Sequence, residues 1–204
     1  VCRPVGALSR ARLAELEPAL FAEVARILDE HAREKGLIHA PSYAGGQRLI
    51  HPDDPDFRVG GHQDFTFSAW VYLDGSTGAN QVVVAKAKGT WEYMIDYTPK
   101  PSQFRFLVSA DSRNTNEVLS RSADPIEFGR WYFITAWHDA ATGTINLQVN
   151  DGPVDSLSHA DGLYNGTADF TVGYRPNGDY LNGRLDELGF WKRVLTPEER
   201  AALY

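Results

Sequence analysis

The chain has 204 residues, of which 43% are hydrophobic and 12% aromatic, and its formal net charge is −7 at pH 7. This length fits one large β domain or a domain with a short appendage, and the apolar content excludes an intrinsically disordered chain. The negative charge argues against nucleic-acid binding, because that surface needs Lys and Arg to replace phosphate counterions.

Cys2 is the only cysteine, so no intrachain disulfide can form, and one thiol does not identify the redox compartment. No apolar run reaches the length of a membrane span, which predicts no membrane insertion. No segment has the pattern of a signal peptide. Because the first residue is Val, we expect a fragment or processed product whose targeting signal lies outside this sequence.

Residues 1–44 are predicted to form a helical N-terminal extension or linker. Apolar residues recur there at steps of three and four, the spacing of one face of a helix. Ser9 and Gly36 suit the two caps, so we expect a helix over residues 9–35. The apolar residues are Leu13, Leu16, Leu20, Phe21, Val24, Ile27 and Leu28.

Residues 45–204 are rich in short aromatic or β-branched runs bounded by Gly, Pro, Asn or Asp. Such runs at regular spacing are typical of a β-sandwich or barrel, and the absence of intervening helices disfavours parallel α/β folds. The chain closes with Thr196-Pro197-Glu198-Glu199, a capping box that predicts a short terminal helix over residues 196–203. The predicted strands are 65–72, 81–86, 91–97, 103–109, 131–137, 144–150, 170–174 and 184–191.

Three segments occur in a recognisable order. Asp64–Tyr72 places a Phe-Thr-x-Ser-x-Trp run after an Asp. Gly129–Phe133 and Asn146–Gly152 form a strand and a hairpin, and Gly183–Trp191 has a Gly-x-hydrophobic-Asp-Glu strand ahead of the terminal helix. Together they resemble the laminin-G-like jelly roll of the concanavalin A-like lectin and glucanase superfamily, as found in modular bacterial and phage proteins.

The resemblance implies an all-β fold, an antiparallel two-sheet β-sandwich over residues 45–204. It also implies a non-catalytic module that binds a carbohydrate or a protein, within a larger extracellular, cell-surface or phage protein. A structural or assembly domain without a small ligand and a divergent glycoside hydrolase stay open as alternatives, because sandwich folds host many functions.

The acidic residues do not favour catalysis. Glycosidases hold two carboxyl groups at a fixed separation, and the similar β-glucanases carry them as Glu-x-Asp-x-x-Glu on one strand. Glu92 and Asp96 are expected to share a strand face, because side chains repeat every two residues, but the third acid is missing. Gly-x-Ser-x-Gly is also absent. We therefore expect no enzymatic activity.

The resemblance further implies a structural calcium ion at Asp186 of the closing strand, completed by carbonyls of Gly45 or Gly46. Calcium accepts roughly six to eight oxygens, backbone carbonyls included. The alternative is a buried Asp186 bonded to backbone amides or to an Arg.

Aromatic rings near predicted strand ends are candidates for stacking on a sugar. Core packing is the alternative for each of them, and Trp70, Trp131, Trp137 and Trp191 lie mid-strand and are expected in the core. The candidate ligand-binding residues are Trp91, Tyr93, Tyr97, Tyr174 and Tyr180.

Overall fold

The computed structural model describes residues 42–44, 48–112, 116–119, 125–176 and 178–204. The helix predicted over residues 9–35, and both Gly45 and Gly46, lie outside these ranges. Within them, no helix is long and apolar enough to cross a membrane.

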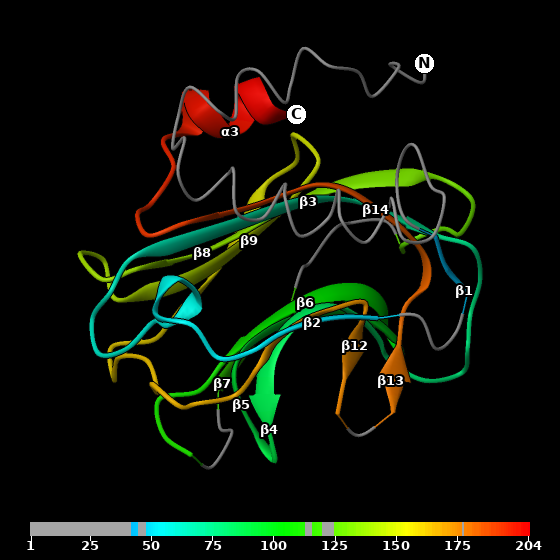
Figure 1. Cartoon of the computed structure of the whole chain (residues 1–204). Coiled ribbons are helices and arrows are strands. Elements are labelled where there is room, and N and C mark those ends of the chain that lie inside the picture. The colour runs from blue at the N-terminus through cyan, green and yellow to red at the C-terminus, as the bar shows by residue number, and fades with distance from the viewer. Residues whose placement is uncertain (1–41, 45–47, 113–115, 120–124, 177) are drawn as a thin grey trace.

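Two six-stranded sheets lie face to face around a common core (Figure 1). Sheet A contains, in spatial order, β1 (Ser42–Ala44), β14 (Asn182–Trp191), β3 (Phe65–Leu73), β8 (Trp131–Asp139), β9 (Thr144–Val149) and β10 (Val154–Ser158). Sheet B contains β2 (Leu49–His51), β11 (Phe170–Val172), β4 (Gln81–Lys88), β5 (Thr90–Pro99), β6 (Ser102–Val108) and β7 (Asn116–Leu119).

Every strand pair in the described ranges is antiparallel, which confirms the predicted all-β, two-sheet sandwich. A further hairpin packs on β4 of sheet B. The remaining elements are the hairpin strands β12 (Tyr174–Arg175) and β13 (Asp179–Tyr180), the short 3-10 helix η1 (Pro55–Phe57) and the helix α3 (Pro197–Leu203).

Alternation along β3 decides which residues enter the core. Phe65, Phe67, Ala69, Val71 and Leu73 are all fully buried between the sheets, because strand side chains alternate between two faces. The residues between them point to the outer face of sheet A.

The helix α3 lies on this outer face (Figure 1). Its capping box forms as predicted: Thr196 Oγ1 accepts the Glu199 N–H, and the Glu199 carboxylate accepts the Thr196 N–H. Leu195 and Leu203 then pack with Trp191 and Phe133 in a second apolar cluster, separate from the main core. The outer face of sheet A is therefore partly covered by the C-terminal segment.

Two buried histidines lie at one end of the sandwich. The His138 and His159 rings are 5.9 Å apart, edge to face. His138 Nδ1 is 2.7 Å from the Gln63 carbonyl oxygen and His159 Nε2 is 2.7 Å from that of Gly162. Since a carbonyl only accepts, these nitrogens carry the protons. The other ring nitrogens, His138 Nε2 and His159 Nδ1, have no hydrogen-bond partner within the described ranges.

Burial lowers the pKa of His138, and the neighbouring His159 lowers it further, against the opposing effects of the Gln63 carbonyl, Asp64 and Asp139. In an unfolded chain a histidine titrates near about pH 6.5. Below that pH the unfolded chain therefore binds more protons than the folded one, so the stability contributed by neutral His138 is complete above about pH 6.5 and falls as pH decreases.

We expect urea-unfolding midpoints to fall between about pH 7 and pH 5, and His138→Gln to flatten that dependence. The control is His62→Gln, at an exposed histidine three residues before β3. It should leave the slope of the urea midpoint against pH unchanged. An equal slope in wild type and His138→Gln would contradict this account.

Candidate functional site

The five predicted aromatic residues do not form one surface. Tyr93 and Tyr97 are 1% and 2% exposed and lie in the core. The Tyr93 hydroxyl donates to the Phe57 carbonyl at 2.9 Å, and the Tyr97 hydroxyl is 3.0 Å from Ser102 Oγ. Because β5 is a central strand whose inner face meets sheet A, these two rings have no face open to a ligand.

Tyr174 and Tyr180 are partly exposed and lie directly opposite each other in the β12–β13 hairpin, with ring centroids 4.9 Å apart. The Arg48 guanidinium is 4.9 Å from the centroid of Tyr174 and donates to the Tyr180 hydroxyl at 3.4 Å. The two rings therefore face a cation.

Trp91 lies beside the next pair of the same hairpin. Arg175 and Asp179 form an ion pair, and the Arg175 guanidinium is 5.8 Å from the Trp91 ring centroid. Since successive strand residues point to opposite faces, Trp91 and the tyrosine pair lie on opposite sides of the hairpin. The structure thus brings Tyr174 and Tyr180 together but does not align Trp91 with them.

The expectation that Glu92 and Asp96 share a face is wrong, because β5 contains a bulge. The pairing of β4 with β5 shifts between Lys86 and Ala87, so that Glu92 turns inward with Tyr93. Asp96 lies opposite Val82 on the outer face of sheet B and forms an ion pair with Arg105 at 2.6 Å. The two carboxylates therefore cannot flank one glycosidic bond.

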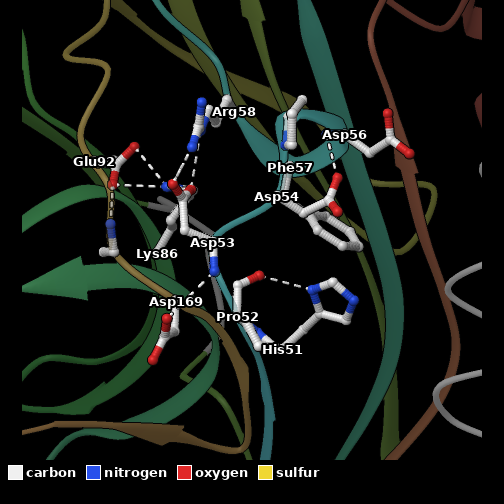
Figure 2. A network of polar contacts seen from close by, with 12 residues as sticks. His51, Pro52, Asp53, Asp54, Asp56, Phe57, Arg58, Lys86, Glu92 and Asp169 are labelled. Atoms are coloured by element: carbon white, nitrogen blue, oxygen red, sulfur yellow. Dashed lines mark hydrogen bonds and ion pairs between the residues drawn. The ribbon is translucent and has the colours of Figure 1, made fainter.

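Glu92 belongs to a buried ion-pair network at one end of the sandwich (Figure 2). The Lys86 Nζ atom, with its side chain fully buried, is 2.9 Å from both Glu92 Oε1 and Asp53 Oδ1. Glu92 Oε1 also accepts the Ala168 N–H at 3.1 Å. The hydrogen bond from Arg58, helped by Lys86, lowers the pKa of Asp53 to about 2. These charges neutralise one another and connect the segment between β2 and β3, and the loop before β11, to β4 and β5 of sheet B.

The calcium ion expected at Asp186 stays a prediction, because Gly45 and Gly46 lie outside the described residues. Asp186 is partly buried on the outer face opposite Trp70, and its Oδ1 accepts the Glu187 N–H at 2.9 Å. Ala44 pairs with Asn182, four positions from Asp186 and roughly 13 Å along the strand. Within the described ranges no three His, Cys, Asp or Glu side chains are grouped closely enough to hold a metal ion.

A groove of about 530 Å³ lies on the outer face of sheet A, beside the start of α3. Trp137 of β8, Asn146 of β9 and Ser156 of β10 lie in one row across three strands, since each pairs with the next. This row alternates with core positions such as Ile145, which fixes its outward direction. The residues of the groove used below are Trp137, Asp139, Thr144, Asn146, Ser156 and Arg200.

The wall of this groove is a chain of oriented polar groups. Ser156 Oγ donates to Asn146 Oδ1 at 2.6 Å, and Asn146 Nδ2 donates to Thr144 Oγ1 at 3.0 Å. The Thr142 and Thr144 hydroxyls are 2.8 Å apart. Each hydroxyl keeps a lone pair beyond these bonds, so the wall can form further hydrogen bonds in fixed directions.

Arg200 of α3 covers the aromatic floor of the groove. Its guanidinium carbon is 4.2 Å from the centroid of the Trp137 ring, which is 6% exposed. Arg200 Nε donates to Gln148 Oε1 at 3.1 Å, and one terminal nitrogen donates to the Leu195 carbonyl at 2.7 Å. Hydroxyls, an amide and a cation that is stacked on an aromatic ring thus meet in one hollow, which provides the few oriented polar groups found in sites for small ligands.

Sequence reasoning missed this groove. It placed Trp137 in the core, and the ring is indeed largely buried, but by Arg200 from a distant part of the chain. The period-2 pattern placed Trp137 and Asn146 on predicted strands but did not predict the strand that carries Ser156. It contained no signal for the pairing register that aligns them or for the docking of α3.

The two-sheet antiparallel sandwich with its helix on one outer face defines a lectin-like jelly roll. Residues 44–199 match the family model of the concanavalin A-like lectin/glucanases superfamily, and the chain belongs to that family. No curated protein matches the sequence.

Several solved structures with this fold are described as carbohydrate- or receptor-binding proteins. Domain 4 of the extracellular GH43 arabinanase of Geobacillus stearothermophilus, in complex with arabinotriose, is 20% identical at a TM-score of 0.61 and covers 80% of this chain and 75% of that one. The binding domain of Paraclostridial Mosquitocidal Protein 1 is 16% identical at a TM-score of 0.62, and the match covers 79% of this chain and 42% of that one. The receptor binding domain of botulinum neurotoxin D is 9% identical at a TM-score of 0.63, and the match covers 81% of this chain and 43% of that one. The chain spans less than half of the two toxin domains.

Loss of the buried cation is expected to destabilise the fold strongly. Lys86→Met leaves Glu92 as an unpaired buried carboxylate, which typically costs about 3–5 kcal/mol of unfolding free energy. The double variant Lys86→Met/Glu92→Gln removes that charge and should recover part of the loss in urea titrations. If the single and double variants are equally stable, the network is not the source of the effect.

If Asp186 and a carbonyl of Gly45 or Gly46 hold a calcium ion, calcium is expected to raise the melting temperature above that in chelator. Coinciding melts in the two buffers would contradict the site. A ligand that binds only the folded state raises the unfolding free energy by about 2.7 kcal/mol at a hundredfold excess over its Kd, which thermal melts resolve. A calcium-dependent rise that Asp186→Asn abolishes would show that further carbonyls complete the site.

Proposed function

We propose that this chain is a non-catalytic carbohydrate-binding module of a larger extracellular or surface protein, and that the groove on the outer face of sheet A is its binding site. The observation that carries the proposal is the row of Asn146 and Ser156 beside Arg200, which presents oriented hydrogen-bonding groups in one hollow. Sugars present many hydroxyls, and such groups can bond to them.

The similarity to a domain bound to arabinotriose supports a carbohydrate ligand, although at 20% identity it establishes the fold alone. Two toxin binding domains have the same fold, and a protein ligand is therefore the competing proposal. A glycoside hydrolase is not supported, because Glu92 and Asp96 lie on opposite faces and each is paired with a cation.

The site is tested by glycan-array screening followed by calorimetry with the oligosaccharides that bind. Asn146→Ala removes the centre of the polar row and is expected to weaken binding about tenfold, as loss of one or two hydrogen bonds does. Tyr180→Ala, on the hairpin beside sheet B, is the control and should leave the affinity unchanged.

The reverse result, in which Tyr180→Ala weakens binding and Asn146→Ala does not, would place the ligand on the Tyr174–Tyr180 pair. Absence of binding to every glycan on the array would contradict a carbohydrate ligand altogether.

A further inference from the structure

The cation of the groove lacks a charged partner. Within the described ranges no carboxylate lies at ion-pair distance from Arg200, whose bonds to Gln148 and Leu195 are to neutral oxygens. Arg200 is partly buried, and this burial lowers its pKa against the opposing attraction of the Glu198 carboxylate, so the guanidinium loses hydration and forms no ion pair within the described residues. A half-buried arginine usually pairs with a carboxylate or phosphate, which makes this one notable.

The acidic side chains near Arg200 are bonded elsewhere. Asp139 accepts the Ala141 and Thr142 N–H groups at 2.9 and 3.1 Å, which closes the turn between β8 and β9. Glu199 forms two hydrogen bonds with Arg193, at 2.8 and 2.9 Å, in addition to its capping bond. Glu198 bonds to Thr196 and to its own backbone at the start of α3. Glu198 attracts Arg200 through space, but none of the three carboxylates forms an ion pair with Arg200.

The guanidinium is also held in a defined plane. It lies over the Trp137 ring at 4.2 Å, and two of its five N–H groups are used by Gln148 and Leu195. The three remaining N–H groups belong to the two terminal nitrogens, the pair that binds a planar carboxylate through two parallel hydrogen bonds. Asn146 and Ser156 lie in the same hollow and can bond to hydroxyls beside such a carboxylate.

We propose that the groove selects sugars that carry a carboxylate, of the uronic acid class, and that Arg200 is the residue that recognises this group. The inference rests on the proposed function and adds the chemical class of the ligand. The whole chain carries a net charge of −7, so recognition of an anion depends on this local cation and not on the general field of the protein.

The test compares three forms of each oligosaccharide by calorimetry on the full chain: the uronate, its methyl ester and the neutral sugar of the same length. Oligogalacturonate, oligoglucuronate and oligomannuronate are the probes. At least one uronate should bind about tenfold more tightly than its ester, since a charge-assisted bidentate pair is replaced by weaker contacts. Arg200→Gln should remove that preference.

Arg184→Gln is the matched control. Arg184 lies on the same face of sheet A and stacks on Tyr72 at 4.7 Å, but it is paired with Asp74. Its replacement should leave the preference unchanged. Arg200→Lys keeps the charge but loses the planar guanidinium, so it should retain only part of the preference for the uronate over its ester. If Arg200→Gln fails to fold, Arg200→Lys is the variant that tests the inference.

Equal affinity for uronate and ester, tighter binding of sulfated than of carboxylated sugars, or a preference that survives in Arg200→Gln would overturn the inference. If Asn146→Ala still weakens binding of neutral oligosaccharides in that case, the carbohydrate-binding function stands and only the acidic preference is wrong. If neither acidic nor neutral oligosaccharides bind, the proposed function itself fails.

Discussion

The apolar contact between the two facing sheets determines the position of almost everything else in the molecule. Phe65 and Phe190 stack at 5.7 Å on the sheet A side, and Phe57 stacks on Phe170 at 4.2 Å toward sheet B. Burial of each such side chain contributes about 1.5–3 kcal/mol. Because strand residues alternate, fixing the inner residues also fixes the outer ones, and the Trp137 row faces outward for this reason.

Two local departures from alternation shape the chemistry. Bulges in the pairing of β4 with β5 turn Val83 together with Val84, and Glu92 together with Tyr93, to the inner side. The cost of burying Glu92 is offset by Lys86 and by the Ala168 N–H. The two acids that the sequence suggested as a possible catalytic pair are thereby separated, and each is paired with a cation.

The C-terminal segment gives the outer face of sheet A its two different regions. Leu195 and Leu203 cover the apolar part with Phe133 and Trp191, while the start of α3 leaves a polar hollow beside β9 and β10. Arg200 connects these regions by lying over Trp137. One short helix therefore both shields apolar surface and supplies the cation on which the proposed preference for acidic sugars depends.

The sequence alone determined the all-β class, the central strands and the terminal helix, because period-2 alternation and a capping box are local signals. It missed β1, β2, β7, β10 and β13, which are short strands, several of them at sheet edges, with little alternation to detect. Only the tertiary structure decided which aromatic rings are buried, where Glu92 points and how Arg200 meets Trp137. These outcomes depend on strand register, bulges and helix docking, which join residues far apart in the chain and leave no periodic trace within it.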